Sequence, residues 1–128
     1  MELPARRFPG ALVLSPAGRI GHDAAEAFRH ALQAQLGTCV AGQDAVVLDM
    51  SSVEYVSSAA LRALLLAARE AKAHGGTLVM AALTPAVREI FEISRFTVLF
   101  RVFATVPEAL AEVAPAAVAA YEARRAPG

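Results

Sequence analysis

Two adjacent serines, Ser57 and Ser58, carry hydroxyl groups where a short loop is predicted to enter a helix. A serine that precedes a helix can cap it, because its oxygen accepts a hydrogen bond from a backbone N–H two or three residues later. If Ser57 is this cap, Ser58 is the first helical residue and its hydroxyl is free at the helix tip. The alternative is that both serines only cap and turn the chain, and their position alone leaves this open.

The other side chains that could do chemistry are scattered along the chain. Asp49 follows a buried strand, at the edge where open α/β sheets bind ligands, but a lone carboxylate there caps a turn more often than it acts as an acid or base. His22, His30 and His74 lack metal-ligand spacing, and Cys39 has no histidine near it in sequence. Phosphate-binding glycine loops and a G-x-S-x-G elbow are missing. We therefore expect no enzyme activity, no metal and no cofactor.

Composition narrows the class of partner. The 12 basic and 12 acidic residues cancel, so no net field attracts nucleic acid or an anionic membrane. The single cysteine cannot form an internal disulfide, which favours a reducing compartment. No signal peptide is recognisable, and the longest apolar stretch, 63–68, is too short to span a bilayer. We expect a cytoplasmic protein with no direct nucleic-acid binding and no membrane insertion.

Apolar periodicity alternates between strands and helices. The run Ala45–Asp49 is typical of a strand buried in a parallel sheet. Residues 58–74 read as an amphipathic helix that Gly75 and Gly76 end. The other expected strands are 3–8 and 11–17, joined by a Pro9–Gly10 turn, then 77–82 and 99–103; the other expected helices are 23–36, one opened by Thr84 and Pro85, and 107–113. Residues 18–22 and the stretch between Asp49 and Ser57 are expected to be connections.

Strand–helix–strand units with short turns predict a single α/β domain over residues 1–128. We expect a mixed β-sheet of about four to five strands covered by about four helices. The core is expected to span about residues 3–113, and 114–128 should be a helical extension or a frayed tail.

The centre of the chain resembles the STAS domain family, specifically the bacterial anti-sigma factor antagonists. The family pattern is a buried strand ending D-[LM]-S-x-V, then an aromatic and an apolar residue, then D-S-[ST/A]-G-L opening a helix. Residues 49–53, the pair Tyr55–Val56 and residues 57–61 stand at these places. The likeness continues around Leu12–Ile20, Gly75–Val79, Thr84–Ile93 and Leu99–Leu110, so that it covers about residues 3–113.

The resemblance implies a phosphorylation switch at Ser58. In such proteins the serine at this position is phosphorylated by an anti-sigma factor that is also a serine kinase of the histidine-kinase-like ATPase type. The unphosphorylated domain binds this kinase and frees its target, phosphorylation ends the binding, and a serine phosphatase resets the switch. The expected partner-binding surface is formed by the helix start and the loop beside it: Ser57, Ala59, Ala60, Arg62, Gly21, His22 and Asp23.

Three residues differ from the family pattern. Ser57 replaces the acidic residue that usually precedes the phosphoacceptor, Ala60 replaces the usual glycine, and Gly21 stands where an acidic residue is common. Arg62, four residues after Ser58, lies on the same helical face and could pair with a phosphate; a solvated arginine is the alternative. For the whole chain the alternatives are a STAS subunit or ligand-sensing module of a transport or other signalling complex without phosphoswitching, and a small enzyme of unrecognised type.

Overall fold

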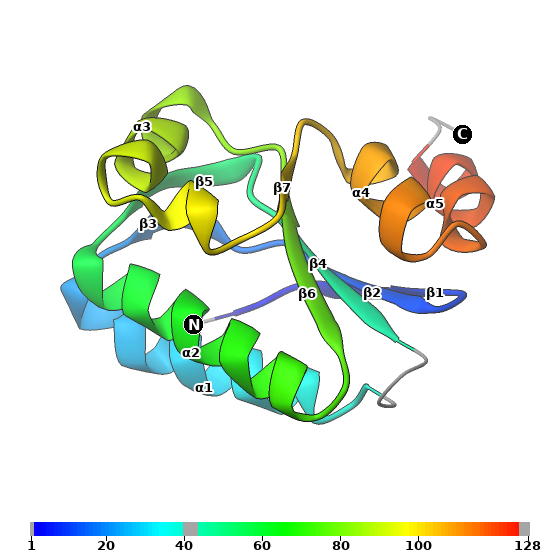
Figure 1. Ribbon diagram of the computed structural model, residues 1–128, viewed down its shortest axis with the longest axis horizontal. Coiled ribbons are helices and arrows are strands. Elements are labelled where there is room, and N and C mark those ends of the chain that lie inside the picture. Colours follow the sequence, from blue (N-terminus) through cyan, green and yellow to red (C-terminus); the bar gives the residue numbers. More distant parts are fainter. Residues whose placement is uncertain (1, 40–43, 126–128) are drawn as a thin grey trace.

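A five-stranded mixed sheet forms the centre of the protein (Figure 1). The computed structural model describes residues 2–39 and 44–125. In order across the sheet the strands are β1 (Ala5–Phe8), β2 (Ala11–Leu14), β4 (Ala45–Asp49), β6 (Thr77–Ala81) and β7 (Val102–Phe103). The β1–β2 pair is an antiparallel hairpin and all other neighbours are parallel. Gly10 takes a φ of 73° in the hairpin turn, a conformation that glycine adopts without steric cost. The α/β class and the mixed sheet are confirmed.

Two further strands form a small second sheet. β3 (Ala17–Ile20) pairs in parallel with β5 (Ser52–Val56). The expectation that these residues are connections is wrong. The strands β2 and β4 pair in parallel in the main sheet. After a short break in each segment the chain continues as β3 and β5, and these two strands pair in parallel as well. A register shift between Gly18 and Arg19, with Gly18 at a φ of 81°, hides this pairing from a simple period-two pattern.

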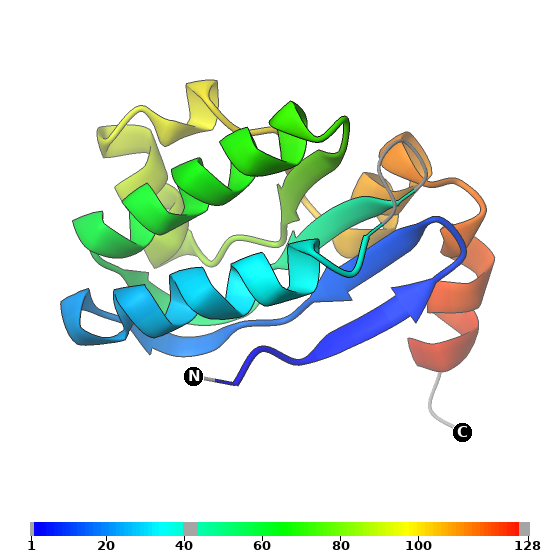
Figure 2. The same cartoon turned by 90° about the horizontal axis from the view of Figure 1, so that it is seen from below.

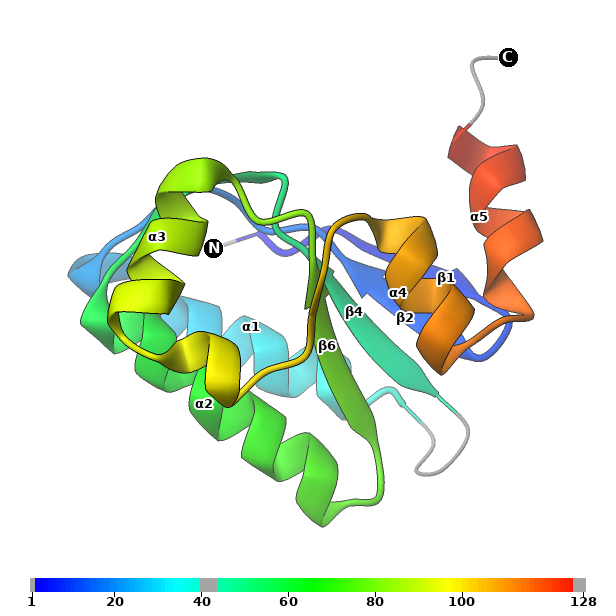
Figure 3. The ribbon, with the colours of Figure 1, turned by 45° about the horizontal axis from the view of Figure 1, so that its top comes forward.

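Helices cover both faces of the main sheet. On one face α1 (Ala25–Leu36) and α2 (Ser58–Ala73) lie side by side, and the 3₁₀ helix η1 (His22–Ala24) leads into α1 (Figure 2). On the other face lie α4 (Val106–Val113) and α5 (Ala117–Arg125) (Figure 3). The helix α3 (Pro85–Ile93) packs against β5, and the 3₁₀ helix η2 (Phe96–Val98) follows it. In the part of the chain described here, no helix is both long and apolar enough to cross a membrane.

Strand alternation divides the apolar core into two layers. In β4 the side chains of Val46 and Leu48 pack with α1, α2 and α3, whereas Val47 packs with α4 and α5. Both faces of β4 are therefore buried, which explains its unbroken apolar sequence. The layer around α1 and α2 contains the fully buried rings of Phe28 and Phe91.

The last third of the chain differs in detail from the expectation. The strand expected at 99–103 is confined to β7, because Phe100 turns inward and packs 6.1 Å from the ring of Phe91. The tail is helical over α5, where Tyr121 is buried edge-on against Phe8 at 5.5 Å. The end of the expected frayed tail, residues 126–128, lies outside the described residues.

Candidate functional site

Ser57 holds the start of α2 in place. Its backbone N–H donates to the carbonyl of Ile20 at 2.9 Å, which ties the helix to the end of β3. Its Oγ accepts from the N–H of Ala60 at 3.1 Å, so Ser57 is the N-cap of α2, which is the first of the two arrangements that the sequence left open. The residue is only 8% exposed. Its hydroxyl is thus occupied and covered.

Ser58 lies at the first helical position and is exposed. The first turn of α2 contains no acidic side chain. The unpaired N–H groups of a first turn and the helix dipole both favour an anion at this place. The two neighbouring serines therefore have different roles. Ser57 is a buried structural cap, whereas Ser58 presents its hydroxyl to solvent at a helix end that stabilises negative charge.

The loop that precedes α1 lies beside this helix start. Gly21 is half-buried at the N-cap position of η1, whereas His22 and Asp23 are exposed. The helix η1 contacts α2, and the Ser57–Ile20 hydrogen bond fixes the strand end from which this loop departs. The structure therefore brings together the two segments that the sequence predicted as one surface.

The remaining predicted site residues on α2 separate into two groups. Ala60 is fully buried beneath the helix start, so its methyl group supports the surface from within the core. Ala59 is half-buried and Arg62 is exposed, and both line a shallow groove of about 200 Å³ between α1 and α2. The other lining residues are Ala25, Glu26, Arg29, Ala63 and Leu66.

A charge cluster occupies the α1 side of this groove. Arg29 Nη2 lies 2.8 Å from Glu26 Oε1, and His30 Nε2 lies 3.0 Å from the same oxygen. The hydrogen bond from Arg29 is the main cause that lowers the pKa of Glu26 below its ordinary value, and the charge of Arg29 adds to it. The pKa of Arg29 is raised in turn, first by its hydrogen bond to Glu26. Glu26 and Arg29 thus stabilise each other's charged forms.

One cation–π pair near the site was not predicted from the sequence. The guanidinium of Arg19 lies 4.6 Å from the ring centroid of Tyr55, and the two residues are partners across the β3–β5 pair. Both strands end at the start of α2, so this cation–π pair borders the Ser58 region. Only recognition of the second sheet would have revealed the pair.

The other candidate residues do not assemble into a reactive site. Asp49 accepts a hydrogen bond from the N–H of Ser51 at 3.1 Å and so caps the turn between β4 and β5. The thiol of Cys39 contacts the carbonyl of Gln35 at 3.8 Å. Within the described ranges, no three His, Cys, Asp or Glu side chains come together in a way that could hold a metal ion.

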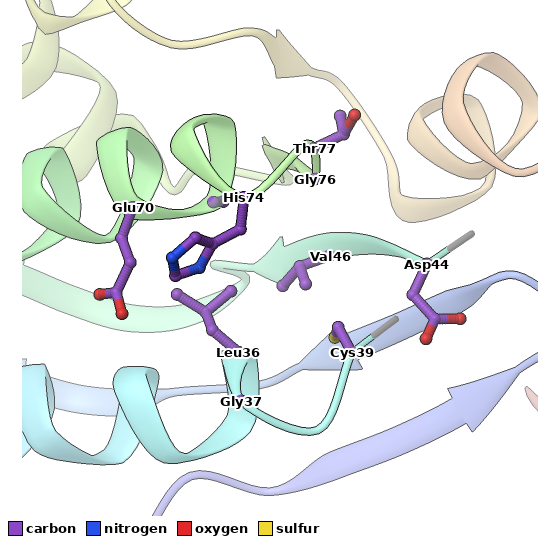
Figure 4. A pocket seen from close by; sticks show the side chains of 10 residues that line it. Leu36, Gly37, Cys39, Asp44, Val46, Glu70, His74, Gly76 and Thr77 are labelled. Carbon is purple, nitrogen blue, oxygen red and sulfur yellow. The ribbon is translucent and has the colours of Figure 1, made fainter. Parts of the chain in front are cut away.

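A cavity lies at the opposite end of α2 from Ser58. It has a volume of about 320 Å³ and opens between the C-terminal ends of α1 and α2 (Figure 4). Leu36, Val46 and Ala71 form its apolar wall, and Glu70 and His74 stand at its edge. None of the predicted site residues lines this cavity.

Comparisons with known proteins agree with the fold. The family model described as STAS domain matches residues 2–109. A Bordetella bronchiseptica protein, "Putative anti-sigma factor antagonist BtrV", is 38% identical over 102 residues, which are 80% of this chain and 85% of that protein. An anti-sigma factor antagonist from Mycobacterium paratuberculosis has a crystal structure with a TM-score of 0.72 and 26% identity, covering 88% of this chain and 92% of that one.

Two further structures bear on the choice of function. The Bacillus cell fate determinant SpoIIAA in its phosphorylated form matches with a TM-score of 0.63 and 19% identity, over 88% of this chain and 99% of that one. A sulfate transporter family protein from Wolinella succinogenes matches with a TM-score of 0.69 and 18% identity, over 84% and 88%. At these identities the likeness concerns the fold, which switch proteins and transport proteins share.

Proposed function

The chain belongs to the STAS domain family, and we propose that it is an anti-sigma factor antagonist that works by partner switching at Ser58. Homology and fold place it with the anti-sigma factor antagonists. In the proposed cycle the unphosphorylated protein binds an anti-sigma factor that is also a serine kinase. Phosphorylation of Ser58 ends this binding, and a serine phosphatase restores it. The protein is then a binding module and not an enzyme.

The observation that carries the proposal is the contrast between the two serines. Ser57 is buried and its oxygen accepts the capping hydrogen bond, so a kinase cannot reach it without opening the helix start. Ser58 is exposed one residue later, on a backbone that the cap and the Ile20 carbonyl hold still. A hydroxyl in this place can be modified without any change of the fold.

The modification transfers the γ-phosphoryl group of ATP to Ser58. A P–O bond forms to Ser58 Oγ, the bond to the leaving ADP breaks, and the hydroxyl proton passes to a base on the kinase. The product carries an added charge of about −1.5 to −2 at neutral pH. Within the domain this charge is tolerated, because it stands at a helix N-terminus. In a tight complex the same charge must be desolvated or expelled, which costs several kcal/mol.

Two of the residues that differ from the family pattern, Ser57 and Ala60, still form the capped helix start that positions Ser58. Ser57 still caps the helix although it carries no charge. Ala60 is accommodated in the core, and its N–H still makes the capping hydrogen bond. SpoIIAA, a protein of the same fold, has been solved in both a phosphorylated and an unphosphorylated form, which agrees with a switch that leaves the fold unchanged.

The test uses paired baits in a lysate of the native organism. Ser58→Ala keeps the uncharged surface, and Ser58→Asp adds a negative charge at the helix tip. Ser51→Asp adds the same charge at an exposed turn away from α2 and is the matched control. Proteins retained by each bait are identified by mass spectrometry. We expect an ATPase of the histidine-kinase-like type with Ser58→Ala and with Ser51→Asp, and at least tenfold less with Ser58→Asp.

Reconstitution with purified components follows. The recovered ATPase, supplied with ATP, should phosphorylate the wild-type chain and Ser57→Ala but not Ser58→Ala. Equal recovery of the ATPase by all three baits would contradict a charge switch at Ser58. Recovery of transporter subunits in its place would favour the alternative, a STAS module of a transport complex.

A further inference from the structure

Arg62 is the uncommitted cation beside Ser58. It is exposed and lines the groove between α1 and α2, and among the described residues it has no carboxylate, hydrogen-bond acceptor or aromatic ring as a partner. The neighbouring arginines differ. Arg29 is paired with Glu26 at 2.8 Å, and Arg19 is stacked on Tyr55 at 4.6 Å. A new anion at the helix tip would therefore find one guanidinium that need not leave another partner.

The helix geometry places this guanidinium within reach of Ser58. Residues four apart on a helix are neighbours on one face, separated by about 6 Å along the axis. An anion on the N-terminal member and a cation on the C-terminal member is the favourable orientation of such a pair. The planar fork of arginine also matches the oxygens of a phosphate, so two parallel hydrogen bonds can form.

We propose that Arg62 binds the phosphate group of phosphorylated Ser58 and that this pairing is a second element of the switch. The inference rests on the proposed phosphorylation of Ser58. Before phosphorylation the groove presents a free guanidinium next to an exposed hydroxyl. After phosphorylation the guanidinium is neutralised and drawn toward the helix tip. A partner then meets an added phosphate and also loses the cation that lined the groove.

Other charged and titratable side chains near Ser58 and Arg62 also affect the pKa of a phosphate at this place. On η1 these are His22 and Asp23, and on α1 they are Glu26, Arg29 and His30. Because all of them remain in an Arg62 variant, the effect of Arg62 must be measured as a difference between variants and not as an absolute value.

The experiment needs no partner protein. Phosphoserine is introduced at position 58 of the full chain by genetic code expansion, and the second pKa of its phosphate is measured by ³¹P NMR titration. The variants are Arg62→Gln, Arg62→Lys and the control Arg69→Gln. Arg69 is exposed on the same helix, and its removal changes the net charge equally, but it lies about 16 Å along the helix axis from Ser58.

We expect Arg62→Gln to raise the phosphate pKa by roughly half a unit, because a nearby cation favours the dianion and solvent screening limits the effect. Arg62→Lys keeps a cation at this place, so the phosphate pKa should stay close to that of the wild-type chain. Arg69→Gln should leave the phosphate pKa within about a tenth of a unit of the wild-type value. Equal shifts in Arg62→Gln and Arg69→Gln, or no shift in either, would overturn the proposal. This result is independent of the kinase: the bait experiment can fail while the phosphate–arginine pair is present, and the reverse also holds.

Discussion

The two ends of α2 are built in opposite ways. At its N-terminal end hydrogen bonds through the N–H and the Oγ of Ser57 hold the backbone, and the neighbouring residues Val56 and Ala60 are buried. At its C-terminal end the helix stops at His74 and Gly75, and a cavity of about 320 Å³ opens toward α1. One end is held by hydrogen bonds and presents the exposed hydroxyl of Ser58, whereas the other opens to a cavity whose lining includes Glu70 and His74.

Under the proposed function, the cavity at the C-terminal end of α2 is not the site of the switch. The proposed switch needs an accessible side chain on a backbone that is tied to its neighbours. The N-terminal end of α2 has both, because Ser58 is exposed and Ser57 is hydrogen-bonded to β3 and to α2. A pocket is needed for binding a small molecule, which the proposed function does not require.

The largest expected contrast concerns the packing beneath the two ends. Ile20 is fully buried under the start of α2, and Ile20→Ala should lower the free energy of unfolding by about 3 kcal/mol. Leu36 is only partly buried beside the cavity, so Leu36→Ala should cost about half as much. Urea unfolding monitored by circular dichroism measures both. Equal losses would mean that the two ends are packed alike.

The next contrast compares the two residues that start and stop the helix. Ser57→Ala removes the cap and should cost about 1 kcal/mol. Gly75→Ala forces a methyl group onto a residue with a φ of 75° and should cost a similar amount, about 1 kcal/mol. Hydrogen exchange separates them, because only Ser57→Ala should accelerate exchange of the Ala60 amide. Fast exchange of this amide in both variants would show that α2 loosens as one unit, and Ser57→Thr should restore the wild-type rate.

A negative charge placed at either end of α2 tests the helix dipole, and the two expected changes in stability are smaller and have opposite signs. Ser58→Asp should stabilise the protein relative to Ser58→Asn by about 0.5 kcal/mol, because the helix dipole favours a negative charge there. Ala73→Asp should destabilise it relative to Ala73→Asn by a similar amount, about 0.5 kcal/mol. Both differences should shrink when thermal or urea unfolding is repeated at high salt. A destabilising Ser58→Asp would contradict the claim that the domain itself tolerates a phosphate.

The helix and its cap could be predicted because their causes are local. A serine before an apolar period of 3.6 residues and two glycines after it determine where α2 begins and ends. The buried parallel strand β4 was equally readable from its apolar run. These features depend on neighbours in the chain and not on distant ones.

What surrounds the helix tip could not be predicted, because it depends on pairing between distant segments. The β3–β5 pair joins residues far apart in sequence, and its register shift at Gly18 disrupts the alternation that would reveal it. The Arg19–Tyr55 contact follows from this pair. Likewise, Ala60 was expected at a partner surface, but the side of α2 that faces the core is set by how the helix lies on the sheet.

The smallest expected effect concerns the charge cluster beside the tip. The hydrogen bond and charge of Arg29 lower the pKa of Glu26, so Arg29→Gln should raise this pKa toward its ordinary value. Arg62→Gln is the matched control, because Arg62 lines the same groove but makes no hydrogen bond to Glu26. Carboxyl ¹³C NMR titration of Glu26 measures both, and an equal rise in the two variants would show that groove charge, and not the hydrogen bond, holds the carboxylate.

The sign of the accompanying pH effect follows from linkage. Because the pKa of Glu26 is lower in the folded than in the unfolded protein, its contribution to stability is fully present above the unfolded pKa. The contribution is lost as the pH falls through the folded pKa, when the carboxylate is protonated and releases Arg29. Acid titration of the unfolding free energy should therefore be slightly steeper in the wild-type chain than in Arg29→Gln. Parallel curves would show that the Glu26–Arg29 pair is screened by solvent and leaves Arg29 as available to an incoming anion as Arg62.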